Sequence, residues 1–184
     1  MKTRHGLLLG IVVAALYACA GSVSSSVPAS ATIFDPQLLG TWTDSATNER
    51  AVMTQAGPRT YAVQYTDGQG QTLSLIGLLG RAGGHFILDV QPTAPALGAY
   101  KDLVVRLHIP LILDTIGGRI HVATLERDSL DHYLRSHPRA VAHSRGRDGF
   151  VLTANSLALH QFLMSYIARP RVLSAATTWE RRSP

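Results

Sequence analysis

From residue 38 onward, the chain is built of short apolar or alternating segments separated by turn residues, and this pattern most constrains its fold. Residues 60–66 (TYAVQYT) place an apolar side chain at every second position, which is the period of a half-buried strand. Glycine-containing turns follow at 67–70 (DGQG), 82–84 (AGG) and 117–118 (GG). The pattern predicts an antiparallel sheet in which short hairpins join consecutive strands.

Two helices interrupt this pattern late in the chain. The first is expected to begin at Asp128 or Ser129 and to end before Pro138. The second is expected to be capped by Asn155 or Ser156, because apolar residues then recur at helical spacing up to Ile167. A small hairpin is predicted between them, and a last strand, 172–180, follows them.

The strands number about eight to ten over roughly 150 residues, which fits a meander closed into a barrel. Closure removes the exposed edges that an open sheet would leave. A two-layer sandwich is the alternative. We therefore expect one mainly β domain over residues 34–184, with the two short helices inserted before its last strand.

The first 18 residues are typical of a secretory signal peptide. Lys2 and Arg4 precede an apolar run at 6–16, which is shorter than the roughly 20 residues needed to cross a bilayer. The run ends at Leu16-Tyr17-Ala18-Cys19, which resembles the lipobox of bacterial lipoproteins. That resemblance implies that Cys19 is lipidated and becomes the first mature residue.

Ordinary cleavage before Gly21, with release of a soluble secreted or periplasmic protein, is the competing interpretation. Cys19 is the single cysteine of the chain, and an unpaired thiol is unfavourable in an oxidising compartment, which favours lipidation. The Ser- and Ala-rich residues after it predict a flexible tether over 19–33. By resemblance to enterobacterial lipoproteins, Ala20 after the cysteine implies the periplasmic face of the outer membrane.

The charge balance argues against a nucleic-acid partner. The chain has 17 Lys and Arg against 12 Asp and Glu, a formal charge of +5. Without Lys2 and Arg4 the count is 15 against 12, or +3, and these residues are dispersed. Proteins that bind nucleic acids concentrate positive charge in a patch or stripe.

Gly40-Thr41-Trp42 resembles the Gly-x-Trp signature that opens lipocalin-like barrels. The resemblance implies a glycine that permits close backbone approach and a tryptophan that plugs the closed end. It also implies an arginine packed over that ring late in the chain, for which Arg181 and Arg182 are candidates. Residues 38–179 also resemble a group of uncharacterised bacterial lipoproteins with a lipocalin-like barrel, in layout and in phrases such as LLGTW and GFVLTA.

Motifs for catalysis are absent from the sequence. It has no Gly-x-Ser-x-Gly elbow, no phosphate-binding glycine loop and no Cys-x-x-Cys pair. Counting back from the turn at 117–118 places Asp114 opposite His121, and this is the single pair suited to acid–base chemistry. A surface contact is the favoured interpretation of the pair. We expect no enzyme, no cofactor and no metal.

These observations favour a lipid-anchored protein of the bacterial cell envelope. Its barrel is expected to bind a small apolar ligand or an envelope protein, since small barrels have room for one small ligand. The alternative is a structural, interaction or inhibitor module in which side chains fill the barrel. The membrane is the expected partner of Cys19, and no nucleic-acid partner is expected.

Overall fold

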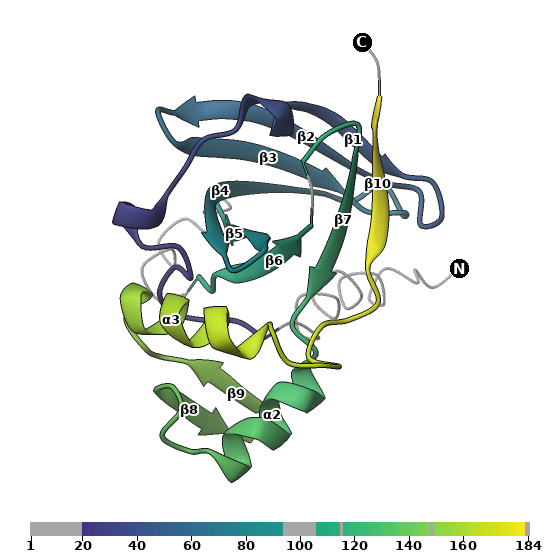
Figure 1. Cartoon of the computed structure of the whole chain (residues 1–184). Helices are drawn as coiled ribbons and strands as arrows, with labels where there is room; N and C mark the ends of the chain where they lie inside the picture. Colours follow the sequence, from purple (N-terminus) through teal and green to yellow (C-terminus); the bar gives the residue numbers. More distant parts are fainter. Residues whose placement is uncertain (1–19, 94–105, 115, 148, 183–184) are drawn as a thin grey trace, which may run out of the picture.

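The computed structural model describes residues 20–93, 106–114, 116–147 and 149–182, so the expected signal peptide, residues 1–18, and Cys19 lie outside the described residues. Eight strands form a closed antiparallel barrel in the order β1-β10-β7-β6-β5-β4-β3-β2. The strands, visible in Figure 1, are β1 (Gly40–Asp44), β2 (Glu49–Gly57), β3 (Thr60–Thr66), β4 (Thr72–Ala82), β5 (His85–Pro92), β6 (Ile109–Leu113), β7 (Arg119–Thr124) and β10 (Thr177–Arg182). The predicted lipocalin-like barrel is confirmed.

The barrel closes where the first strand meets the last. In β1, Trp42 is paired with Arg181 of β10 on one side and with Ala51 of β2 on the other. The other neighbouring strands of the barrel are consecutive in sequence, with one exception. Strands β7 and β10 pair directly, although the two helices and a small hairpin lie between them in the sequence. The sandwich alternative is therefore wrong.

The meander gives the barrel two different ends. Successive hairpin turns of an antiparallel sheet lie at opposite ends, so the turns after β2, β4 and β6 share one end with the segment that enters β1. The turns after β1 and β3 share the other end with the connections at the end of β7 and the start of β10. The first end is sealed, and the second opens onto a cavity.

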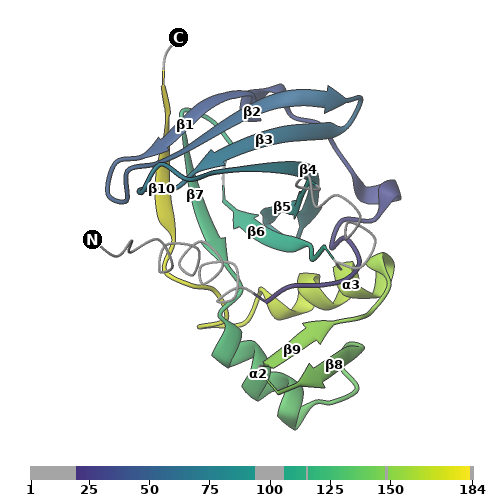
Figure 2. The same cartoon turned by 180° about the vertical axis from the view of Figure 1, so that it is seen from behind.

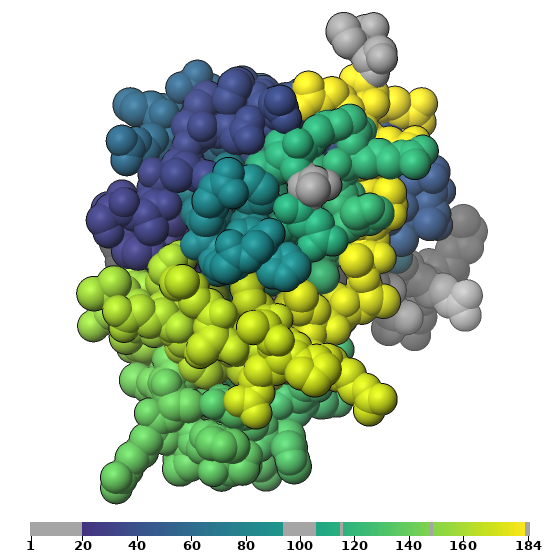
Figure 3. Space-filling view, in the orientation of Figure 1, coloured from purple at the N-terminus to yellow at the C-terminus, as the bar shows by residue number. Residues whose placement is uncertain are grey.

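A helical layer covers the outer face of β4, β5 and β6. It consists of α2 (Arg127–Ser136), the hairpin of β8 (His143–Gly146) and β9 (Gly149–Leu152), and α3 (Ser156–Tyr166). Its buried residues, among them Leu130, Leu159 and Leu163, share one core with Ala82, Ile87 and Ile112 of the barrel. Figures 1 and 2 show this layer on one side of the barrel, and the space-filling view in Figure 3 shows α3 lying directly against the strands. No helix in these ranges is long and apolar enough to cross a membrane.

The helix boundaries are confirmed in part. Asn155 caps α3, with its side chain accepting a hydrogen bond from the Ala158 amide at 2.9 Å. The cap of α2 is Glu126 rather than Asp128 or Ser129, so this helix begins earlier than predicted. The backbone amide of Glu126 bonds the Val172 carbonyl at 2.8 Å, which fixes the chain where the helix starts.

Residues 20–33, expected to be a flexible tether, are instead packed against the barrel. Ser22 exchanges backbone hydrogen bonds with His108, and Val23 bonds the carbonyl of Leu152. Val27 is 1% exposed and approaches β4 so closely that a Cβ on Gly80 would lie 2.7 Å from its Cγ1. Glycine at this position therefore serves the close approach of the N-terminal segment, and the packed domain includes residues 20–33.

Candidate functional site

The sealed end of the barrel is closed by Trp42, which is fully buried. Its indole Nε1 donates a hydrogen bond to the Leu38 carbonyl at 2.9 Å, and the guanidinium carbon of Arg181 lies 4.9 Å from the ring centroid. Of the two candidate arginines, Arg181 thus supplies the cation. Gly40 has a φ of +121°, and a Cβ at this position would have no other group within 4 Å. This glycine is therefore required by backbone conformation and not by close approach.

Tyr61 completes the seal. Its ring stacks on Phe34 with centroids 5.0 Å apart, and its hydroxyl accepts from the Asp35 amide at 2.7 Å and donates to the Asp35 carbonyl at 3.1 Å. These bonds hold the segment before β1 across the end of the barrel. Burial raises the pKa of Tyr61 above its usual value, so the hydroxyl keeps its proton and remains a donor.

The interior also contains a cavity of about 620 Å³. Its wall is aliphatic and includes inward-facing side chains of six strands: Met53, Val63, Leu75, Val90, Leu111 and Ile120. Turn residues Thr47 and Gln69 also line it, which places its mouth at the end of the barrel opposite Trp42. The barrel is therefore hollow, a property that sequence patterns do not determine.

A group of larger side chains lies near this mouth. Tyr65 and Trp179 line the cavity with ring centroids 6.5 Å apart, and the indole Nε1 of Trp179 donates to the Thr177 hydroxyl at 2.9 Å. Burial and then the adjacent Glu49 carboxylate raise the pKa of the Tyr65 hydroxyl well above its usual value. Tyr65 therefore stays neutral and presents a donor towards Glu49.

Among the described residues that line the cavity, the charged ones are both acidic: Glu49 and Asp67. Asp67 also has a structural role, because its carboxylate accepts from the amides of Gln69 at 2.9 Å and Gln71 at 2.8 Å and so caps the turn after β3. The Ser174 hydroxyl accepts from the Thr124 amide at 3.0 Å. The mouth thus combines an apolar wall with hydrogen-bond acceptors and negative charge.

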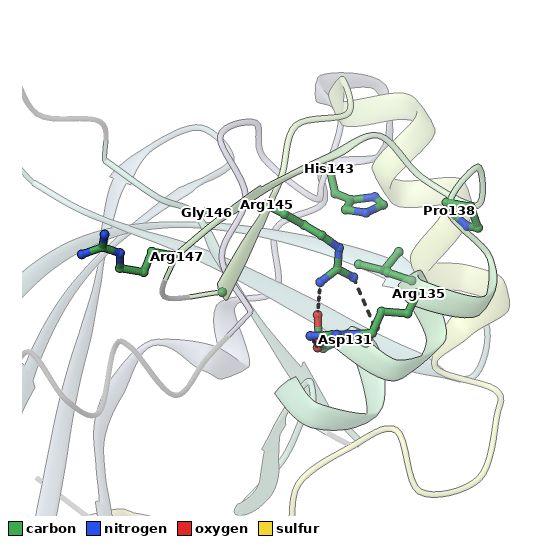
Figure 4. Close-up of a pocket in the computed structure, with 9 residues that line it drawn as sticks. Asp131, Arg135, Pro138, His143, Arg145, Gly146 and Arg147 are labelled. Atoms are coloured by element: carbon green, nitrogen blue, oxygen red, sulfur yellow. Dashed lines mark hydrogen bonds and ion pairs between the residues drawn. The ribbon is translucent and has the colours of Figure 1, made fainter.

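A second, polar pocket of about 560 Å³ lies between α2 and the β8–β9 hairpin (Figure 4). Arg145 and Arg135 both form ion pairs with Asp131, and Figure 4 shows Arg147 pointing away from this group. Hydrogen bonding from Arg145, and less so from Arg135, lowers the pKa of Asp131 below its usual value. The Asp131 carboxylate is thus paired with two guanidinium groups. Because Arg145 lies on β8 and Asp131 on α2, their ion pair joins the β8–β9 hairpin to the helix.

The one candidate acid–base pair does not form. The predicted register is confirmed, since the Asp114 amide bonds the His121 carbonyl at 3.3 Å. The side chains diverge, however: the Asp114 carboxylate meets His85 Nδ1 at 3.0 Å, and His121 Nδ1 meets the Thr178 hydroxyl at 3.1 Å. The two residues are therefore exposed backbone partners whose side chains bind other groups, so neither interpretation of the pair holds; the Asp114 side chain is 54% exposed.

Sequence reasoning missed a buried polar cluster on the outer face of β5. Asp89 is 1% exposed; one carboxyl oxygen accepts from the Ser26 amide at 2.7 Å and hydroxyl at 2.5 Å, and the other meets His108 Nδ1 at 2.5 Å. His160 Nδ1 in turn lies 2.9 Å from the Ser26 carbonyl. The Ser26 hydroxyl donates to the Asp89 carboxyl group, and both residues are fully buried. The cluster joins residues 20–33 to the barrel and α3.

Comparison of the chain with protein-family models, with curated proteins and with solved structures finds no match. Within the ranges that the structure describes, no three potential ligands from His, Cys, Asp and Glu converge as a metal site. The cavity with its acidic mouth is therefore the feature from which a function must be argued.

Proposed function

We propose that this chain is a lipid-anchored binding protein of the bacterial cell envelope, which holds one small apolar ligand inside its barrel. The observation that carries the binding part is the aliphatic cavity of about 620 Å³. Small-molecule sites range over roughly 300–1,000 Å³ and are mostly apolar, with few polar groups that orient the ligand. The cavity has these properties, with Glu49, Tyr65 and neutral hydroxyl groups at its mouth.

The energetic argument is the hydrophobic effect. Each methylene group that a ligand transfers from water to the cavity contributes about 0.8 kcal/mol. The walls formed by Val63, Leu75 and Val90 are held by the barrel, so binding does not require them to be ordered first. The alternative module, with a filled barrel, requires side chains where the cavity lies, and the interior therefore favours the ligand-binding proposal.

The anchor rests on the sequence. A basic start, an apolar run and Leu16-Tyr17-Ala18-Cys19 support lipidation of Cys19, and Ala20 supports delivery to the periplasmic face of the outer membrane. Several acyl chains hold a protein firmly at a bilayer, since each buried methylene contributes. An envelope protein bound to the outer surface of the barrel is the second candidate partner.

Ligand binding is tested by filling the cavity. Val63 faces the cavity and is 5% exposed, whereas Val52, which precedes the Val63 partner Met53 on β2, is not among the lining residues. Native mass spectrometry of the protein purified from its source membrane should show a bound small molecule, lost in Val63→Phe and kept in Val52→Phe. Saturation at about 100 times Kd should also stabilise the wild type by about 2.7 kcal/mol.

Recovery of the wild-type protein without any small molecule, together with no rise in Tm on addition of medium-chain lipids, would defeat the proposal. Equal retention of ligand by Val63→Phe and Val52→Phe would place the binding site outside the barrel, and would also defeat it.

A further inference from the structure

The charged side chains among the described residues at the mouth of the cavity are negative. Glu49 and Asp67 are its charged lining residues, and no Lys, Arg or His is among the described residues that line it. An anionic amphiphile such as a fatty acid would need a positive partner for its carboxylate at this position. The described residues that line the mouth offer the opposite sign.

We propose that the cavity selects a single-chain amphiphile whose polar end donates hydrogen bonds and carries no negative charge, with an alkylammonium preferred over an alcohol. The proposal rests on the ligand-binding function above and specifies the chemical class of its ligand. The Glu49 carboxylate is the acceptor for the polar end, and the aliphatic wall holds the chain.

Glu49 is suited to this role by its position and its neighbours. It is partly buried at the start of β2 and lines the cavity beside Tyr65. A carboxylate has about four acceptor sites, so the Tyr65 hydroxyl leaves capacity for a ligand. The raised pKa of Tyr65 keeps that hydroxyl neutral, which prevents a second negative charge from arising beside Glu49.

The neighbouring polar groups are less available. The Thr177 hydroxyl accepts from Trp179 Nε1, and the Ser174 hydroxyl accepts from the Thr124 amide. The Asp67 carboxylate is bound by two backbone amides of its own turn, although its charge still acts at the mouth. Glu49 is therefore the group whose removal should change the choice of ligand.

The test compares three probes with the same chain and different polar ends: decylammonium, decanol and decanoate. They are titrated below their micellar concentrations into the full protein at about pH 7.5, where the amine is protonated and the acid ionised. Affinity is measured by calorimetry and by the fluorescence of Trp179, which lines the cavity. We expect decylammonium to bind at least about tenfold more tightly than decanol, and decanoate about tenfold more weakly than decanol.

Glu49→Gln removes the charge and keeps the size of the side chain. It should weaken decylammonium about tenfold, leave decanol within about twofold, and strengthen decanoate. Glu180→Gln is the matched control, because Glu180 is an exposed carboxylate on β10 that pairs with Arg119 and does not line the cavity. It changes the net charge equally and should leave all three affinities unchanged.

If the Glu49→Gln protein does not fold, the wild-type preference is tested by ionic strength, since screening should weaken decylammonium and leave decanol unchanged. Decanoate binding as tightly as decylammonium overturns the charge preference while the binding proposal stands. Failure of all three probes to bind overturns the ligand-binding function itself. Equal effects of Glu49→Gln and Glu180→Gln would show a general charge effect and overturn the role of Glu49.

Discussion

The guanidinium carbon of Arg181 lies 4.9 Å from the centroid of the Trp42 ring, and the two residues are also backbone partners across the seam between β1 and β10. The seam closes the barrel, so the side-chain contact reinforces the pairing on which closure depends. Trp42 is further fixed by its bond to the Leu38 carbonyl. Two contacts of Trp42 therefore stabilise the sealed end. The bond to Leu38 lies within the N-terminal segment, and the contact with Arg181 joins the first strand of the barrel to the last.

Replacing Arg181 by Met should lower the free energy of unfolding by about 0.5–1 kcal/mol, the range of partly exposed cation–π contacts. Arg182→Met is the control, because Arg182 bonds the exposed Thr43 hydroxyl at 3.2 Å, a contact that water can replace. Urea unfolding measures both. A loss for Arg182→Met that equals or exceeds the loss for Arg181→Met would contradict the role of the ring contact.

The described part of the chain contains two Asp–His pairs in opposite environments. Asp89 meets His108 at 2.5 Å with side chains 1% and 17% exposed, whereas Asp114 meets His85 at 3.0 Å with side chains 54% and 36% exposed. Asp89→Asn should destabilise the protein by about 2–4 kcal/mol, because it replaces a buried acceptor by a donor that faces other donors. Asp114→Asn should cost less than about 0.5 kcal/mol.

Hydrogen exchange localises the effect. Since Asp89 accepts from both the amide and the hydroxyl of Ser26, Asp89→Asn should increase exchange at residues 22–27 well before global unfolding. Protection there equal to that of the wild type would show that the cluster does not hold the N-terminal segment.

Two buried tyrosines also differ in their hydrogen bonds. The Tyr61 hydroxyl both accepts from and donates to the backbone of Asp35, whereas the buried Tyr166 hydroxyl has no hydrogen-bond partner within the described ranges. Tyr61→Phe should therefore cost about 1–3 kcal/mol, and Tyr166→Phe should be neutral or stabilise the protein by up to about 1 kcal/mol. Denaturant unfolding measures both, and similar losses in the two variants would contradict this assignment.

The fold was predictable because its determinants are local. Each of three confirmed predictions depends on a pattern that spans only a few residues: the alternation in residues 60–66, the glycine turns and the cap at Asn155. Trp42 was recognisable from a three-residue motif, although only the register of β10 distinguishes Arg181 from Arg182 as its partner.

The site was less predictable because its contacts are distant in sequence. Ser26 and Asp89 are 63 positions apart, and a Ser-rich stretch gives no local indication that its amides are bound. A carboxyl group within the apolar strand 85–92 was the one available signal that a buried partner exists. The cavity depends on how side chains of many strands fill one volume, which no local pattern reports.

Asp131 gives the protein a defined response to acid. Its folded-state pKa is lowered by Arg145 and Arg135, so its contribution to stability is present above the unfolded-state pKa and is lost as pH falls through the folded-state pKa. Arg145→Gln should reduce stability by at most about 1 kcal/mol at neutral pH, with the difference from wild type shrinking below about pH 4. Arg147→Gln is the control, because Arg147 points away from Asp131 (Figure 4). Urea unfolding between about pH 2 and 7 measures the difference, and a pH-independent gap would contradict the ion pair as its cause.

The proposed lipidation of Cys19 would place the acyl group directly before a packed segment. Ala20 is 3% exposed and Ser22 is bonded to His108, so an acyl group on Cys19 would hold the domain close to the bilayer without a long spacer. Mass spectrometry of the mature N-terminus should find acylated Cys19, and the protein should partition with membranes. Cys19→Ala should appear in the soluble fraction with its Tm unchanged. An unmodified N-terminus at Gly21 in the wild type would contradict the anchor, and so would a Cys19→Ala protein that still partitions with membranes.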